Sequence, residues 1–191
     1  MNTLLSRYGT LGLAGALSVL MWATRGNHFI SPTHLPDASW AIFFLLGFYL
    51  RQRALLPLFL AQAALIDYVA ITQWGASSFC VTPAYVFLAP AYAALWYAGR
   101  LSAQHFKASA HNLPRFAAAA FVGTFVCELI SSGSFYFLGG RFADTHLSEF
   151  GARLVAYFPG DLGGVALYLS AAALIHMALA GGHRSASHSA S

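Results

Sequence analysis

The sequence predicts an all-α integral membrane protein, a bundle of six transmembrane helices with almost no soluble part. Of its 191 residues, 58% are hydrophobic and only 8% are Asp, Glu, Lys or Arg. A soluble domain carries about 25% charged residues, so this chain lacks the charges that a water-facing surface needs. Its apolar residues also gather in runs, and a run of roughly 20 such residues is enough to cross a bilayer as a helix.

The apolar runs predict six spans in order along the chain, near 4–24, 38–51, 54–73, 82–99, 115–138 and 155–180. The first has the alternative of a signal peptide, but no small-x-small cleavage site follows it, so we expect a retained helix. The second is short and is separated from the third by three residues, which predicts a tight helical hairpin. Pro83 suits the first turn of the fourth helix. We expect residues 1–181 to form one domain and residues 182–191 a disordered tail.

The basic residues indicate how the bundle is oriented, because cytoplasmic loops carry an excess of Lys and Arg. Six spans place both termini on one side, with the 51–53 turn and the 100–115 loop. That side carries seven basic residues and no acidic one: Arg7, Arg51, Arg53, Arg100, Lys107, Arg115 and Arg184. The opposite loops, 24–38, 74–82 and 139–154, mix both signs: Arg25, Arg141 and Arg153 with Asp37, Asp144 and Glu149. Both termini are therefore expected in the cytoplasm.

Several classes of protein are excluded by what the sequence lacks. It contains no Gly-rich phosphate loop, no His-Glu-x-x-His and no Cys-x-x-Cys. The chain is therefore not expected to hydrolyse ATP itself. Its single lysine and its arginines lie between apolar runs, a pattern that indicates membrane topology and not nucleic-acid binding.

Cys80 is the most informative single residue, because it follows the third span at the outer side. The other cysteine, Cys127, lies eleven residues inside the fifth span, a depth of roughly 16 Å, so no disulfide between them is expected. Cys80 then has two interpretations. It is either a small buried hydrophobic residue or a soft ligand or nucleophile that lines an outward pocket.

Carboxylates inside the predicted spans also have two interpretations. Asp67 lies roughly 9 Å below the outer boundary of the third span, where it either bonds to a neighbouring helix or forms a wall of a polar pocket. Glu128, near the middle of the fifth span, is either a proton or ion site or a helix-to-helix hydrogen bond. Asp161 follows Pro159-Gly160, where it is expected to cap a broken helix.

Small residues recur at a spacing of four along the first span, in the ladders Thr10/Ala14/Ser18 and Gly12/Ala16. Such spacing lets a second helix approach closely. The ladders serve either packing within this bundle or docking to a separate membrane partner.

The chain resembles the substrate-binding S-components of energy-coupling-factor (ECF) vitamin transporters. The resemblance rests on its mass of about 20 kDa, its six predicted spans, its predicted cytoplasmic ends and the small residues of its first span. The thiol in Ser77-Ser78-Phe79-Cys80 makes it similar to the BtuM-like, cobalamin-specific S-components of Gram-negative bacteria. The resemblance implies uptake of cobalamin across the inner membrane, with Cys80 as an axial ligand of cobalt. It also implies an ECF module as partner, a coupling protein with ATPases, met through Gly12, Ala14, Ala16 and Ser18.

The chemistry of the ligand then predicts further contacts. A thiolate is a strong soft donor to the cobalt of a corrin, and its attack is expected to help expel an upper ligand such as cyanide. The amides of the corrin rim and the phosphate of the nucleotide tail need polar partners. By predicted position, these are His28, Asp67, Tyr85 and Arg153. Cobalamin is here the transported ligand, and no cofactor of the chain's own is expected. The alternatives are an S-component for another vitamin and a membrane thiol oxidoreductase.

Overall fold

The computed structural model describes residues 2–25, 35–50, 52–105 and 113–188, and in them every regular element is helical. Six α-helices occur in these residues, which confirms the predicted all-α class. Their bounds are α1 Asn2–Arg25, α2 Ser39–Tyr49, α3 Leu55–Gln73, α4 Leu88–His105, α5 Leu113–Leu138 and α6 Leu147–His188. Two short 3-10 helices, η2 Ser78–Cys80 and η3 Pro83–Phe87, connect α3 to α4.

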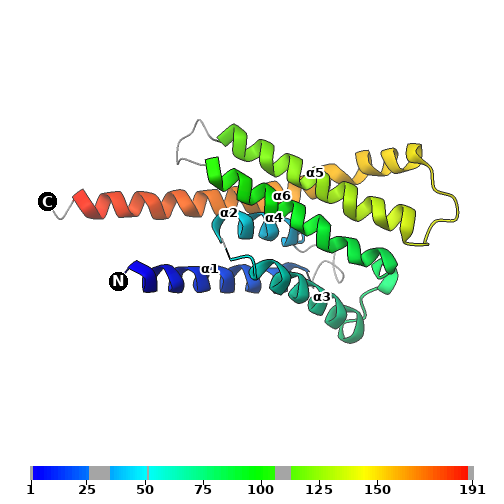
Figure 1. The fold of residues 1–191 in the computed structure, drawn as a ribbon, viewed down its shortest axis with the longest axis horizontal. Helices are drawn as coiled ribbons and strands as arrows, with labels where there is room; N and C mark the ends of the chain where they lie inside the picture. The colour runs from blue at the N-terminus through cyan, green and yellow to red at the C-terminus, as the bar shows by residue number, and fades with distance from the viewer. Residues whose placement is uncertain (1, 26–34, 51, 106–112, 189–191) are drawn as a thin grey trace.

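Three of the described helices are long and apolar enough to cross a membrane, namely α3, α5 and the Leu147–Ala178 part of α6. The shorter α2 is also apolar, and it is the most enclosed element, with most of its residues buried between its neighbours. The helices run roughly along the long axis of the molecule, and α1 begins at the end where α6 finishes (Figure 1). We call this end the termini end and the opposite one, where η2 lies, the Cys80 end.

The closest helix crossing joins α2 to α4. A Cβ atom on Gly47 would meet the backbone carbonyl of Trp96, and a Cβ atom on Gly99 would meet that of Phe44. Glycine at both positions lets the two backbones touch, as small residues do between membrane helices. Around this crossing, Phe43 stacks on Tyr92 with ring centroids 4.4 Å apart.

Three boundaries differ from those expected. The chain after Pro83 first forms η3, so α4 begins at Leu88 and runs to His105. The last helix begins at Leu147, because Glu149 favours a helix N-terminus and pairs with Arg153 one turn later. It continues to His188, so residues 182–188 are helical where a disordered tail was expected.

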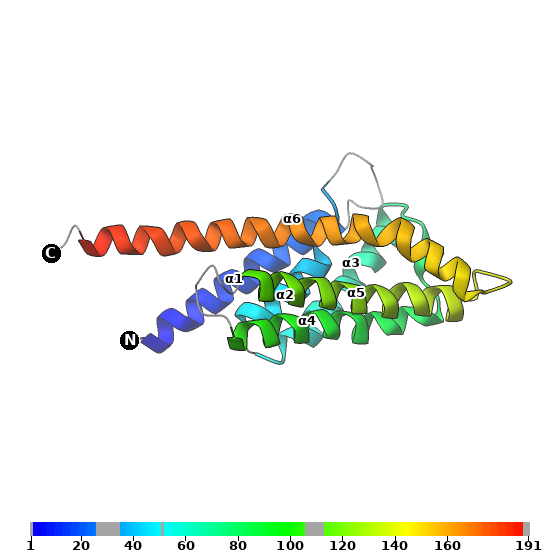
Figure 2. The same ribbon diagram turned by 90° about the horizontal axis from the view of Figure 1, so that it is seen from above.

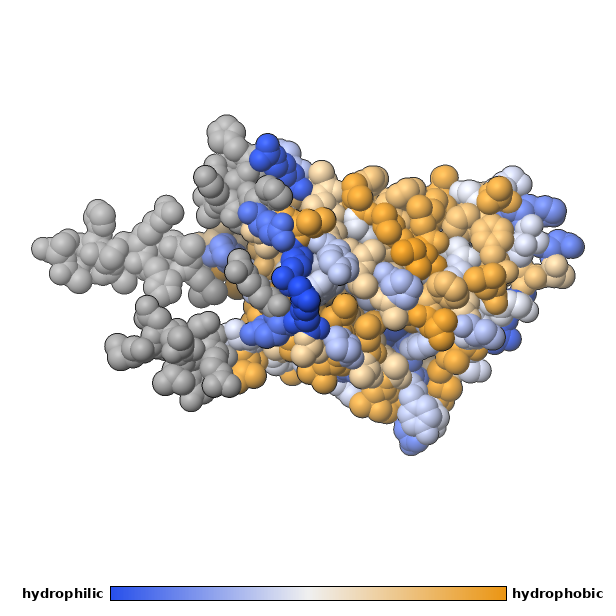
Figure 3. Space-filling model, viewed as in Figure 1, coloured by the Kyte–Doolittle hydropathy of each residue, from blue (hydrophilic) through white to orange (hydrophobic). Residues whose placement is uncertain are grey.

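Pro159 lies inside α6, which does not break there. Figure 2 shows the yellow part of the helix inclined to its orange part, the bend that a proline imposes by removing one backbone hydrogen bond. Asp161 therefore does not cap a separate helix. On the face shown in Figure 3, hydrophobic residues form a broad central region, and hydrophilic residues border it on both sides along the long axis.

Candidate functional site

A buried ion pair joins the end of α1 to the middle of α3. Arg25 donates to Asp67 through Nε and one terminal nitrogen, with both contacts at 2.6 Å. Both residues are nearly enclosed, at 6% and 7% exposure. Such a bidentate pair fixes orientation as well as charge, and it is the partner that a buried carboxylate requires. Asp67 thus bonds to a neighbouring helix, the first of its two interpretations.

The same guanidinium gathers residues from two further helices. Its second terminal nitrogen lies 3.3 Å from Asp37, 3.1 Å from Ser39 and 2.9 Å from Tyr92. Asp37 in turn accepts the backbone N–H of Ser39 at 2.9 Å and so orders the entry to α2. The two acidic side chains and the one arginine leave this cluster with a formal charge of −1. We call the six residues Arg25, Asp37, Ser39, Asp67, Tyr85 and Tyr92 the Arg25 cluster.

Tyr85 connects this cluster to the segment that carries Cys80. It lies in η3, and its hydroxyl donates to Asp67 at 2.6 Å. Asp67 thereby accepts three hydrogen bonds, most of what a carboxylate can accept. The structure brings together two of the predicted site residues, Asp67 and Tyr85. Their contact with a ligand stays a prediction.

Cys80 is exposed, so its interpretation as a buried hydrophobic residue is wrong. It ends η2, a turn that Ser77 caps by accepting the backbone N–H of Phe79 at 3.2 Å. Cys127 is fully buried, and both cysteines are free, as the difference in depth predicted. An exposed thiol on a short, capped turn is accessible to a soft metal.

Arg141, from the loop between α5 and α6, holds the Cys80 turn. Its Nε donates to the carbonyl of Phe79 at 3.0 Å, and its guanidinium lies 5.0 Å from the centre of the Phe79 ring. That ring also packs edge-on against Phe135, with centroids 5.7 Å apart. The peptide that precedes Cys80 is therefore fixed by a second part of the chain.

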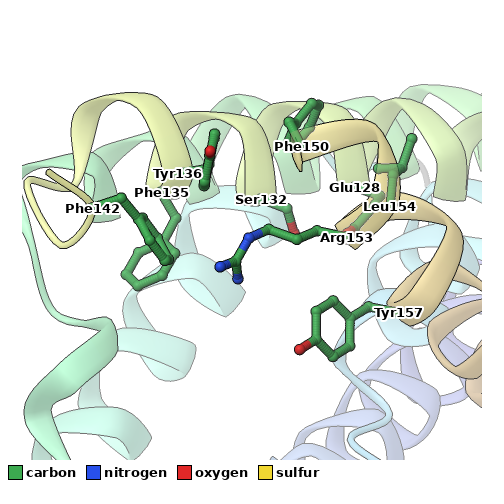
Figure 4. A pocket seen from close by; sticks show the side chains of 9 residues that line it. All are labelled: Glu128, Ser132, Phe135, Tyr136, Phe142, Phe150, Arg153, Leu154 and Tyr157. Atoms are coloured by element: carbon green, nitrogen blue, oxygen red, sulfur yellow. The ribbon is translucent and has the colours of Figure 1, made fainter. Parts of the chain in front are cut away.

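Phe135 is also part of the wall of a cavity of about 150 Å³ between α5 and α6. The cavity is lined by aromatic rings and by four other side chains: Phe135, Tyr136, Phe142, Phe150, Tyr157, Leu154, Glu128, Ser132 and Arg153. Figure 4 shows Arg153 crossing the middle of this space, with its guanidinium toward Phe135 and Phe142 and with Tyr157 on the other side.

Arg153 is held there by charge and by aromatic faces. Its guanidinium lies 4.5 Å from the centre of the Phe142 ring and donates to Glu149 at 2.9 Å. Glu149 also accepts from the Tyr136 hydroxyl at 2.9 Å. Glu128, only 3% exposed, is at the wall of the same cavity. The arrangement presents a positioned cation within an aromatic wall, which suits an anionic or amide-bearing ligand.

Of the predicted site residues, His28 lies outside the described residues. Cys80 and Arg153 are linked indirectly, through Phe79 and Phe135. Neither Arg25 nor Arg141 was predicted from the sequence as a site residue. The signal for Arg25 was available, because a carboxylate such as Asp67 within an apolar span needs a cation. Arg141 had no comparable signal.

No protein-family model and no curated protein matches the sequence.

Proposed function

We propose that this chain is a cobalamin-specific S-component, which binds cobalamin at the Cys80 end and carries it across the bacterial inner membrane. The observation that carries the proposal is the exposed thiol of Cys80. The thiol stands on a turn capped by Ser77, and the Phe79 ring of that turn packs against Phe135 in the wall of the cavity between α5 and α6. The resemblance to BtuM-like S-components supports the same function.

Cys80 is proposed as an axial ligand of the cobalt. Cobalamin offers two axial positions above and below a flat corrin, and a thiolate is a soft, strong donor for such a position. The exposed aromatic residues near Cys80, Trp74 and Phe79, are 43% and 49% exposed and offer flat apolar surfaces to the ring.

The polar groups of the ligand are proposed to contact Arg153 on one side and residues of the Arg25 cluster on the other. Arg153, positioned by Glu149 and Phe142, suits the phosphate of the nucleotide tail or an amide oxygen. Tyr85 and Asp67 are the proposed partners of the corrin amides on the other side, together with His28. Asp67 acts there mainly by holding the Tyr85 hydroxyl in place.

The thiolate is also proposed to remove an upper ligand such as cyanide. The step is a ligand exchange without change of oxidation state. The Cys80 sulfur donates an electron pair to Co(III), the cobalt–carbon bond to cyanide breaks, and cyanide leaves with that bond's electron pair. The proton that the thiol released can leave with it as hydrogen cyanide.

Transport is proposed to occur with both termini in the cytoplasm and with an ECF module as partner. In α1, Gly12 and Ala16 are exposed, so this small ladder is the proposed contact. Ala14 instead packs against the hydrophobic core, and Ser18 donates to Gln62 at 3.0 Å. The Thr10/Ala14/Ser18 ladder is therefore proposed to pack within the bundle, and the Gly12/Ala16 ladder to contact the partner.

The visible absorption spectrum of protein purified after growth with cobalamin tests this proposal. The parent is compared with Cys80→Ala and with Cys127→Ala, the matched loss of the buried thiol. We expect a corrin spectrum in the parent and in Cys127→Ala. In Cys80→Ala the colour should be lost or its bands shifted. Colourless parent protein would overturn cobalamin binding, and screening with thiamine, biotin and riboflavin would then test the other vitamins.

Three further outcomes separate the parts of the proposal and its alternative. An unchanged spectrum and affinity in Cys80→Ala would overturn cobalt–thiolate ligation while leaving cobalamin binding intact. Cyanocobalamin whose spectrum stays constant for hours with the parent protein would overturn the removal of cyanide. Turnover of a quinone or a disulfide by colourless protein would favour the thiol oxidoreductase.

A further inference from the structure

A second cavity lies at the termini end, away from Cys80. It has a volume of about 230 Å³ and is bounded by the last turn of α2 and the last turns of α4. Its lining consists of Gly47, Phe48, Arg100, Ala103 and Gln104. We call it the Arg100 groove. None of these residues takes part in the site described above.

The helix crossing shapes the floor of this groove. Because Gly47 has no side chain, its Cα can face the Trp96 carbonyl, and the ends of α2 and α4 meet here. The groove is the space that remains open beside this contact. Arg100, half-buried, is held over the face of Trp96 with its guanidinium 5.1 Å from the ring centre. A guanidinium is planar, and stacking on a ring fixes the orientation of the N–H donors at its edge, the donor set that binds phosphate oxygens.

The sequence near the residues that line the groove carries charge of one sign. Among the described residues of segments 50–60 and 96–120, Arg53, Arg100 and Arg115 are basic and none is acidic. On the face shown in Figure 3, a strip of hydrophilic residues borders the hydrophobic region on the side of the termini end. Arg100 directly follows the predicted fourth span, 82–99, and an arginine at the end of an apolar run is expected at the depth of lipid headgroups.

From these observations we infer that the Arg100 groove binds the phosphate group of an anionic phospholipid. Arg100 would pair with the phosphate, the Gln104 amide would donate to one of its oxygens, and Phe48 would line the groove beside the glycerol. The volume is below the roughly 300–1,000 Å³ of pockets that enclose drug-sized ligands, and it suits a headgroup. This inference is independent of cobalamin binding.

Thermal unfolding of delipidated protein in detergent tests the inference. The probes are palmitoyl-oleoyl phosphatidylglycerol, the matching phosphatidylcholine and inorganic phosphate. For the parent we expect phosphatidylglycerol to raise Tm by about 5 °C more than phosphatidylcholine at a large excess over Kd. Arg100→Gln should lose this difference. Arg115→Gln, which removes an exposed arginine outside the groove, should keep it.

The outcomes distinguish the sources of phosphate. A shift with phosphatidylglycerol alone supports the lipid. An equal, Arg100-dependent shift with inorganic phosphate would overturn the lipid as ligand in favour of a free anion. Equal shifts with both lipids, or a full shift in Arg100→Gln, would overturn the site. If Arg100→Gln does not fold, Gln104→Leu provides the second variant, and it should lose at least half of the difference.

Discussion

Single residues show how this protein accommodates charge within an apolar bundle. Arg25 lies where α1 ends, and its guanidinium donates to side chains of α3 and α4 and to Ser39 at the start of α2. Thr24, its neighbour, accepts the backbone N–H of Ala38 at 3.2 Å. The two ends of the 26–37 segment are therefore fastened to each other and to the bundle. The Arg25 cluster is therefore a structural joint between α1, α2, α3 and α4.

Replacing Arg25 by Gln should destabilise the protein strongly. The change leaves Asp67 buried without its cation, and breaking a buried pair in this way costs about 3–5 kcal/mol. We expect a clear fall in Tm for the detergent-purified protein. Arg53→Gln, which removes an exposed arginine, is the control and should change Tm little. The double variant Arg25→Gln/Asp67→Asn should recover part of the loss, and additive losses would contradict the pairing.

Tyr85→Phe isolates the hydrogen bond that joins η3 to this cluster. Loss of one hydrogen bond to a charged group is expected to cost about 1.5–3 kcal/mol of unfolding free energy. Tyr68→Phe removes a hydroxyl from a tyrosine that is 66% exposed, and should be nearly neutral. Denaturant titration in micelles measures both. Equal stability of the two variants would show that the Tyr85 hydroxyl contributes nothing to the fold.

The sequence predicts such residues only in part. Cys80, Asp67, Tyr85 and Arg153 stand out as polar or reactive side chains near predicted span ends. Arg25 looks like an ordinary loop arginine, because its partner Asp67 is 42 residues away and only helix packing brings the two together. Arg141 reaches Phe79 across 62 residues in the same way. Pairings at such distances follow from the fold and from no local pattern.

At the scale of elements, hydropathy predicts helices well and their ends less well. Four of the six predicted helix starts lie within two residues of the observed starts, and those of α4 and α6 are the exceptions. The exceptions have local causes. η3 precedes α4 because Thr82 caps a 3-10 turn by accepting the backbone N–H of Ala84 at 3.2 Å. α6 begins early through the ion pair of Glu149 and Arg153, which a count of apolar residues does not register.

The crossing of α2 and α4 offers a prediction for helix packing. Gly47→Ala or Gly99→Ala places a methyl group against a backbone carbonyl of the partner helix, which cannot move aside as a side chain can. We expect a loss of about 3 kcal/mol or more, at the upper end of overpacking effects. Gly12→Ala in α1 meets no atom within 4 Å and is the control.

The control should change stability in the opposite direction. Alanine favours a helix over glycine by roughly 0.5–1 kcal/mol, so Gly12→Ala is expected to leave Tm equal or higher. Tm values of Gly47→Ala, Gly99→Ala and Gly12→Ala, measured in the same detergent, test both predictions. A loss in Gly12→Ala as large as in Gly47→Ala would mean that α1 packs within the bundle through its exposed face.

At the scale of the whole molecule, the charges are sorted between its two ends. Described arginines at the termini end, such as Arg53, Arg100 and Arg115, lie in segments without acidic residues. The ion pairs instead lie in the other half, at Arg25 and at Arg153. The positive-inside rule predicts that this basic end faces the cytoplasm. The same orientation would place the proposed Cys80 site on the outer side.

Labelling of cysteines in intact cells tests this orientation. A membrane-impermeant maleimide added to spheroplasts should label Cys80, which is exposed and is predicted to face outward. Cys127, at 0% exposure, should not react before denaturation, so Cys80→Ala should stay unlabelled. An Arg115→Cys substitution in the Cys80→Ala background places a thiol at an exposed position of the termini end. It should react only after the membrane is opened, and labelling of this thiol in sealed spheroplasts would reverse the assigned orientation.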